Sequence, residues 1–186
     1  MSLDYNKIFD ENKILEGERI FLRPFTLKDK RDVYEYAGSE KVTKYLTWEK
    51  INSLEKAESI ILDIYRRRKG IFAIEHKAEQ KCIGCIDLRI ESSDCKASFG
   101  YVLNESYWNK GYMTEALKMI LDLAFNKLKL NRLEATHYAG NEGSGRVMEK
   151  CGMIYEGTGR EETLIKGIYH DVKHYGILKR DYKGKG

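Results

Sequence analysis

The sequence predicts an α+β (mixed α/β) fold built on a central, twisted and mostly antiparallel sheet. Short polar turns separate three β-type runs within residues 71–103, and connections this short require antiparallel neighbours. Apolar residues at a 3.6-residue period then fill residues 113–128, and a further β-type run follows. We expect about seven strands, one parallel pair and about four helices, in a single domain covering residues 1–186.

The N-terminal part predicts one strand and two helices. Residues 1–17 predict no more than a short helical turn, and residues 19–25 alternate enough to form a strand. The next two segments, 26–38 and 52–65, each begin with the spacing of a capping box and carry an apolar stripe. We therefore expect two consecutive helices after the first strand.

The middle of the chain predicts an antiparallel meander that leads into the longest helix. The β-type runs are residues 71–76, 81–90 and 96–103. After the helix, residues 132–137 form a strand that crosses over and lies parallel to the strand before the helix.

The C-terminal part predicts a short helix and the last strands. Residues 141–150 have helical character, and the β-type runs are residues 153–155, 162–165 and 170–178. We expect a hairpin whose turn lies at residues 166–167.

Composition sets the broad class of the protein. The chain has 186 residues, 42% hydrophobic and 33% charged, as is ordinary for a soluble globular domain. Neither an apolar run of about 20 residues nor a secretory signal is present, so we expect a cytoplasmic protein with no membrane contact. The net charge of +4 is spread along the chain, which argues against a nucleic-acid partner.

The turn before the long helix is the first candidate site. Gly111 lies where the chain must turn sharply and let another molecule approach the backbone. The first N–H groups of a helix lack internal partners and lie at the positive end of its dipole, so they suit a phosphate, and Lys110 adds a positive charge. A glycine that only relieves crowding in the turn is the alternative.

Segments along nearly the whole chain resemble one family. The matching stretches are residues 19–25, 100–103, 107–116, 141–144, 148–153, 155–157 and 170–172. They resemble the GCN5-related N-acetyltransferases, most closely the branch of the bacterial ribosomal-protein N-terminal acetyltransferases. The resemblance implies the fold of that family, with acetyl-coenzyme A as cofactor and direct transfer of its acetyl group to an amine in a ternary complex.

The acceptor is left open by this resemblance. A protein N-terminus, such as that of a ribosomal protein, is one expectation, and a polyamine or an antibiotic amine is another. A sensor or scaffold that binds acyl-coenzyme A without catalysis is the alternative to an enzyme. The segments expected to set specificity are residues 45–51 and 164–170, and the protein is expected to be a monomer or a homodimer.

The resemblance also implies where the cofactor lies. Its pantetheine arm would lie where the two parallel strands splay apart, paired with the backbone of the first strand, and backbone amides after that strand would hold the pyrophosphate. The cofactor-binding residues expected on this basis are Val102, Trp108, Asn109, Lys110, Gly111, Tyr112, Met113, Thr114, Asn141, Ser144 and Lys150. The family's phosphate pattern has Gln or Arg where Trp108 stands and Gly or Ala where Met113 stands. Backbone groups do the binding, so these departures weaken the match only moderately.

Three residues are the expected catalytic set, namely Ser144, Asn141 and His137. Asn141 and Ser144 match family positions that bind the cofactor arm. Many relatives have a tyrosine that acts as the general acid where Met148 stands here. The resemblance therefore implies that Ser144 interacts with the coenzyme A sulfur as it leaves. Capping of the following helix is the alternative role for both residues.

The general base is not determined by the sequence. Ser98 replaces the Glu that relatives often carry. A neutral histidine suits this task, which makes His137 a candidate, although a lone histidine in a strand is more often structural. Asp87, Glu49 and a chain of water molecules are the other candidates.

Two further motifs could suggest a metal site and a dinucleotide-binding loop, but their spacing argues against both. Cys82 and Cys85 form C-x-x-C, but in a strand residues three apart face opposite sides, so we expect two buried thiols and no metal site. The glycines of residues 140–145 are spaced G-x-x-G-x-G rather than the G-x-G-x-x-G of a dinucleotide-binding loop.

Overall fold

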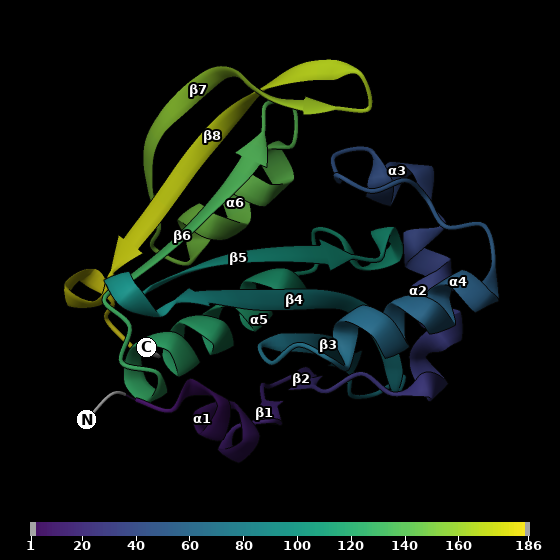
Figure 1. Ribbon diagram of the computed structural model, residues 1–186, viewed down its shortest axis with the longest axis horizontal. Helices are drawn as coiled ribbons and strands as arrows, with labels where there is room; N and C mark the ends of the chain where they lie inside the picture. The colour runs from purple at the N-terminus through teal and green to yellow at the C-terminus, as the bar shows by residue number, and fades with distance from the viewer. Residues whose placement is uncertain (1–2, 185–186) are drawn as a thin grey trace.

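The computed structural model describes residues 3–184 and contains one eight-stranded sheet (Figure 1). Its strands, in the spatial order β1-β2-β3-β4-β5-β6-β8-β7, are β1 (Leu15–Glu16), β2 (Ile20–Arg23), β3 (Ile71–His76), β4 (Lys81–Glu91), β5 (Lys96–Leu103), β6 (Arg132–Tyr138), β8 (Ile168–Leu178) and β7 (Ile154–Ile165). All neighbours are antiparallel except β5 and β6. The predicted fold class and its parallel pair are therefore confirmed.

Six α-helices accompany the sheet within the described residues. They are α1 (Tyr5–Glu11), α2 (Lys30–Ala37), α3 (Glu40–Thr43), α4 (Leu54–Ile60), α5 (Tyr112–Asp122) and α6 (Glu142–Lys150). A π-helical turn extends α4 to Tyr65, and another extends α5 to Lys127, so both match the lengths predicted from their apolar stripes. The N-cap of α4 is Ser53, one residue later than the capping box predicted at residues 52–55, and its hydroxyl accepts the Lys56 N–H at 3.2 Å.

Two hydrophobic clusters hold the helices on opposite faces of the sheet. The larger cluster joins α5 to the sheet and is centred on fully buried side chains such as Leu117, Ile120 and Ile86. The smaller one lies under α2 and α4, around Val33, Ala57 and neighbouring strand residues. Figure 1 shows α2 and α4 on one face and α5 on the other, so each side of the sheet has its own core.

The parallel pair of strands is short, and this opens the sheet. Only three residue pairs join β5 to β6, and the last of them pairs Ser98 with Glu134. Beyond it β5 continues to Leu103 and β6 to Tyr138, each bound only to its other neighbour. Five residues of β5 (99–103) therefore lack a partner on the side facing β6, as expected if the pair splays apart.

Three local features differ from the sequence-based prediction. The runs 153–155 and 162–165 form one strand, β7, whose pairing with β8 is irregular between Gly159 and Thr163. The two-residue strand β1 and the one-turn helix α3 were not expected, because both are too short to carry a periodic pattern. The two-residue turn at Lys166 and Gly167 is confirmed, with φ angles of 50° and 78°.

The expected orientation of the two cysteines is wrong. A β-bulge leaves Ile83 without a facing residue on β3, because Cys82 pairs with Glu75 while Gly84 pairs with Ile74. The extra residue reverses the alternation, so Cys82 and Cys85 both lie in the core under α2 and α4. Both thiols are buried and free, and burial raises the pKa of each.

Candidate active site

A cavity of about 690 Å³ lies at the opening between β5 and β6. Its walls come from the end of β5, the turn into α5, the loop and first turns of α6, and the α3 segment, by which we mean residues 39–51. Ten of the eleven predicted cofactor-binding residues line it, namely Val102, Trp108, Asn109, Gly111, Tyr112, Met113, Thr114, Asn141, Ser144 and Lys150. The chain thus brings two segments about 40 residues apart in sequence to one place.

The turn from β5 to α5 presents free backbone donors. Gly111 is the N-cap of α5 with φ 85°, a conformation that glycine adopts without strain, and Asn109 has φ 59°. No described residue accepts a hydrogen bond from the backbone N–H groups of residues 109–114. These donors lie at the positive end of an 11-residue helix, so the turn can hold an anionic group such as a phosphate.

Arg19 fixes this turn from outside the cavity. Its Nη1 donates to the Lys110 carbonyl at 2.9 Å, and its Nε donates to Glu115 Oε2 at 2.9 Å. The guanidinium also lies 4.6 Å from the centre of the Tyr112 ring. In a trans peptide the N–H points away from the C=O, so the bond to the Lys110 carbonyl turns the Gly111 N–H away from Arg19. The Lys110 side chain lies over the Tyr107 ring and is the one predicted cofactor-binding residue outside the lining.

The first turn of α6 lies on the other wall. Asn141 is the N-cap of α6, but its side chain accepts no capping hydrogen bond, and it lines the cavity. The Ser144 hydroxyl donates to Tyr101 Oη at 2.9 Å, and the Tyr101 hydroxyl donates to the Ser144 carbonyl at 2.9 Å. Neither side chain acts as a simple helix cap. Burial raises the pKa of Tyr101, so this phenol is neutral.

His137 lies beneath α6 and outside the cavity lining. Its Nδ1 lies 3.0 Å from the Tyr138 carbonyl, which assigns the proton to Nδ1, and its ring stacks on Tyr175. The buried Nε2 has no partner among the described residues. A Cβ placed on Gly145 would lie 2.7 Å from this nitrogen, so the imidazole faces the backbone of α6. A role for His137 as the base stays a prediction, and its position gives it no contact with the cavity.

The other two candidate bases also lie outside the lining. Asp87 is on β4, its Oδ2 lies 3.5 Å from Arg89 Nε, and burial raises its pKa. Glu49 is exposed and lies 3.7 Å from Lys166 Nζ. Glu142 is the single carboxylate that lines the cavity within residues 3–184, and its bond to Lys173 at 2.9 Å lowers its pKa. The cavity therefore contains no free carboxylate and no imidazole in that part of the chain.

Positive charge dominates the cavity walls. Lys41, Lys44, Arg146 and Lys150 line it, against the one carboxylate already described. Within residues 3–184 the last three of these cations form no ion pair, while Lys41 lies 3.5 Å from Glu105. An anionic ligand or an acidic acceptor matches this lining, and a polycation does not.

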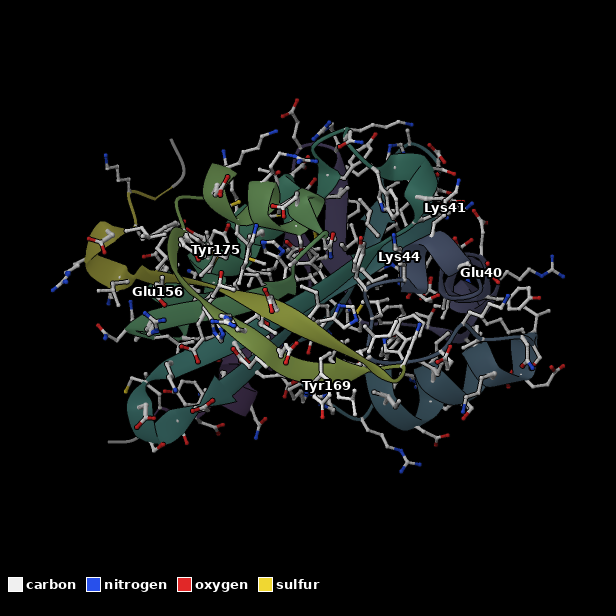
Figure 2. The ribbon with its side chains drawn as sticks, turned by 90° about the horizontal axis from the view of Figure 1, so that it is seen from above. Glu40, Lys41, Lys44, Glu156, Tyr169 and Tyr175 are labelled. Atoms are coloured by element: carbon white, nitrogen blue, oxygen red, sulfur yellow. The ribbon has the colours of Figure 1, made fainter. Side chains whose placement is uncertain are left out.

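The α3 segment closes the end of the cavity that faces the β7–β8 hairpin. Lys166, in the hairpin turn, donates to the Thr43 carbonyl at 3.0 Å. Tyr45 lies against the loop before α6, where a Cβ on Gly140 would be 2.9 Å from its hydroxyl. Figure 2 labels Lys41 and Lys44 at the α3 end of the molecule and Tyr169 on the hairpin. Tyr45 and Leu46, which belong to the segment 45–51 expected to set specificity, line the cavity.

Sequence reasoning missed several residues of the site. From the sequence Tyr101 is a strand residue with no further role, and no role follows for Arg146, Lys41 and Lys44, yet all four line the cavity. A signal for Tyr101 did exist, because Tyr101 and Phe99 lie on one face of β5 at the two-residue period of a strand. The sequence indicated a role in specificity for residues 45–51, but it gave no sign that the residues of α3 itself would line the cavity.

The chain belongs to the acetyltransferase (GNAT) domain family, whose model matches residues 19–154. In a crystal structure titled as an acetyltransferase of the GNAT family from Bacillus anthracis, the fold matches with a TM-score of 0.82 at 30% identity, covering 90% of this chain and 99% of that one. The chain is therefore an acetyltransferase by family, and GNAT enzymes use acetyl-coenzyme A.

Two of the following three relatives have names that state an acceptor, and the two acceptors differ. "Probable N-acetyltransferase YjcK" of Bacillus subtilis (strain 168) is 34% identical over 92% of this chain and 89% of its own length. "Putative ribosomal N-acetyltransferase YdaF" of the same organism is 32% identical over 69% and 72%. "Spermidine N(1)-acetyltransferase" of Vibrio cholerae serotype O1 (strain ATCC 39315 / El Tor Inaba N16961) is 27% identical over 89% and 96%.

The residues of the site fit coenzyme A. The unpaired stretch of β5 offers backbone groups to an amide-containing arm, and the free N–H groups of residues 109–114 offer donors to a pyrophosphate. Arg146 and Lys150 add positive charge on α6. No group of three metal-binding side chains was found in residues 3–184, and no helix in that part of the chain is long and apolar enough to span a bilayer.

Proposed function

We propose that this protein transfers the acetyl group of acetyl-coenzyme A directly to the α-amino group of a protein N-terminus. One observation carries the choice of acceptor. The described part of the cavity lining has no free carboxylate and no histidine, so no side chain there can take a proton from an ammonium group. The acceptor must therefore arrive as a neutral amine.

The pKa of the acceptor then decides which amines can react. An α-amino group has a pKa of about 7.7–8.0, so roughly a quarter of it is neutral near pH 7.4. A lysine-like amine, as in a polyamine, has a pKa near 10.4, and only about one molecule in a thousand is neutral. Without a base this difference favours an N-terminus by about two orders of magnitude.

The charge of the lining supports the same choice. A polyamine carries several positive charges and would find Lys41, Lys44 and Arg146 in the walls, with Glu142 already bound to Lys173. Positive side chains near the amine also disfavour its ammonium form. An N-terminal peptide with acidic residues after its first position would instead find cations to pair with. We therefore expect acidic N-termini to be the better acceptors.

Direct transfer, rather than an acetylated enzyme, is supported by the lack of an activated nucleophile. No cysteine lines the cavity among the described residues, and burial raises the pKa of Cys151 to about 11. The Ser144 hydroxyl bonds Tyr101, which burial keeps neutral, so no base activates it. The amine would attack the thioester itself. The nitrogen loses one proton to water, and the coenzyme A sulfur leaves as a thiolate that takes one proton from water.

The test is release of the coenzyme A thiol from acetyl-coenzyme A with a panel of acceptors. The panel contains peptides with a free N-terminal Ala or Ser followed by acidic or by basic residues, the same peptides with a blocked N-terminus and an internal lysine, and spermidine. We expect kcat/KM to be highest for the acidic peptides with free N-termini and lowest for spermidine.

Other outcomes would point elsewhere. Faster acetylation of spermidine than of any peptide would overturn the proposed acceptor. If acetyl-coenzyme A raised the Tm but no amine were acetylated, a sensor that binds acyl-coenzyme A would be the better description.

A further inference from the structure

Two tyrosines tie α6 to the sheet, and they do so at different points of the helix. Tyr101, on β5, binds Ser144 in the first turn of α6, with two contacts of 2.9 Å. Tyr175, on β8, binds Glu149 near the end of the helix at 3.1 Å. Tyr101 lines the cavity, and Tyr175 does not. Figure 2 labels Tyr175 on the sheet.

The two bonds of Tyr101 are not redundant. A phenol has one proton, and here it goes to the Ser144 carbonyl. The Ser144 proton goes to the phenol oxygen, so the serine hydroxyl points away from any other acceptor. While both bonds hold, the Ser144 hydroxyl can accept a hydrogen bond from a group in the cavity but cannot donate one. It cannot hydrogen-bond a negatively charged sulfur in that state.

We propose that Tyr101 is a positioning residue that acts through Ser144, and that the pair turns together when a thiolate forms in the cavity. This inference rests on the proposed function, because it needs the coenzyme A sulfur to lie at Ser144. When the thiolate forms, the Ser144 hydroxyl rotates to donate to sulfur, and the Tyr101 hydroxyl rotates from the carbonyl to donate to Ser144 Oγ. Both side chains keep their protons.

This rotation of the two hydroxyls strengthens the hydrogen bond from Ser144 to the sulfur, where the negative charge forms. A hydroxyl that accepts one hydrogen bond while donating another is a better donor, and chains of this kind are stronger in a low-dielectric site. The phenol also stays neutral, because burial opposes the charged form. Tyr101 thus serves to orient and polarise Ser144 and does not act as an acid itself.

The experiment is a double-mutant cycle of Tyr101→Phe and Ser144→Ala, with Tyr175→Phe as the matched control. The phenylalanine keeps the ring and removes only the hydroxyl. We expect each single variant to lower kcat about tenfold with KM for acetyl-coenzyme A within about twofold of wild type. We expect the double variant to be no slower than the slower single variant, and Tyr175→Phe to keep wild-type kcat.

A second readout does not need an acceptor. The pKa of the thiol of bound coenzyme A can be followed by the ultraviolet absorbance of its thiolate as the pH is raised. Donors to the thiolate lower this pKa, so Tyr101→Phe and Ser144→Ala should each raise it by about one unit, and Tyr175→Phe should not. The Tm of each variant identifies a general loss of folding.

The outcomes separate this inference from the proposed function. Multiplicative losses in the double variant, or an effect of Tyr101→Phe on KM alone, would overturn the role of Tyr101 while acetyl transfer stands. If no amine is acetylated but the thiol pKa rises in both variants, the acceptor proposal fails and the Tyr101–Ser144 pair stands. An unchanged thiol pKa in Tyr101→Phe contradicts the pair in either case.

Discussion

The two ends of the cavity are built in different ways. The end at the α5 N-terminus consists of backbone groups, held by a glycine, a helix and the contacts of Arg19. The other end consists of side chains from the α3 segment, which a hydrogen bond from Lys166 to the Thr43 carbonyl ties to the β7–β8 hairpin. These side chains are Lys41, Val42, Lys44, Tyr45 and Leu46. On the proposed function, the backbone end would hold the cofactor that the family shares, and the side-chain end would contact the acceptor. We expect substitutions at the two ends to affect different ligands.

The largest effect is expected for Gly111→Glu at the cofactor end. The substituted residue would keep a positive φ that costs about 1–2 kcal/mol, and its Cβ would lie 3.3 Å from Arg19 Nη2. Its carboxylate would compete with the Lys110 carbonyl and with Glu115 for the Arg19 guanidinium, and it would add a negative charge at the N-terminus of α5. The Kd for coenzyme A should rise about 100-fold or more, because the turn would lose its contacts with Arg19 and the added charge would repel a phosphate. Calorimetry measures this directly.

Gly152→Glu is the control for backbone strain. Gly152 has φ 84°, almost the same as Gly111, and a Cβ there would meet only Ile177 at 3.8 Å. The control should lose stability and keep its affinity for coenzyme A. Equal Kd values for Gly111→Glu and wild type would remove the α5 turn from the cofactor site.

Arg19→Gln should have a smaller effect at the same end. The substitution removes the bond to the Lys110 carbonyl and the ion pair with Glu115, so the Gly111 N–H would no longer be held in one direction. We expect the Kd for coenzyme A to rise about tenfold, with kcat nearly unchanged at saturating cofactor. Arg132→Gln, which breaks the pair with Glu156 elsewhere on the sheet, is the matched control. A fall in kcat with an unchanged Kd would contradict this role.

Lys44→Glu tests the acceptor end. It reverses one unpaired charge in the lining and should raise KM for an acidic N-terminal peptide about fivefold at low salt, while the Kd for coenzyme A changes little. The effect should shrink as salt is added, since exposed charges are screened. Lys56→Glu, on the exposed side of α4, is the control. A higher Kd for coenzyme A with an unchanged acceptor KM would show that Lys44 serves the cofactor.

Asp87→Asn should affect stability rather than activity. Burial raises the pKa of Asp87 above its ordinary value of 3.8, so the folded protein holds this proton at a pH where the unfolded chain has lost it. The stability of wild type should therefore fall as pH rises from about 3.8 through the raised pKa, and the variant should lack this fall. Chemical denaturation across that range measures it, with Asp94→Asn as an exposed control. A large loss of kcat would instead support Asp87 as the base.

The sequence was most informative where local chemistry decides the structure. The long apolar stripe of α5, the turn glycine Gly111 and the hairpin turn at Lys166 each follow from residues close together in the chain. Ten of the eleven residues predicted to bind the cofactor line one cavity, although most of those assignments came from the family resemblance.

The rest depended on contacts that no local pattern encodes. The bulge at Ile83, which moves Cys82 into the same core as Cys85, comes from pairing across two strands. The position of His137 beneath α6 depends on how that helix packs, and the bonds between Tyr101 and Ser144 join residues 43 positions apart. The positive charge of Lys41 and Lys44 in the cavity likewise depends on where the α3 segment packs.

The short pairing between β5 and β6, which joins three residue pairs, has a consequence for the stability of the protein. A strand edge inside a sheet is left without its partner, and the bound cofactor arm would act as the missing strand. Such a ligand stabilises only the folded chain, by about 2.7 kcal/mol when its concentration is 100 times Kd. We therefore expect amide hydrogen exchange along residues 99–103 to slow when coenzyme A is added. The free energy of unfolding should then rise with the concentration of the acetyl donor.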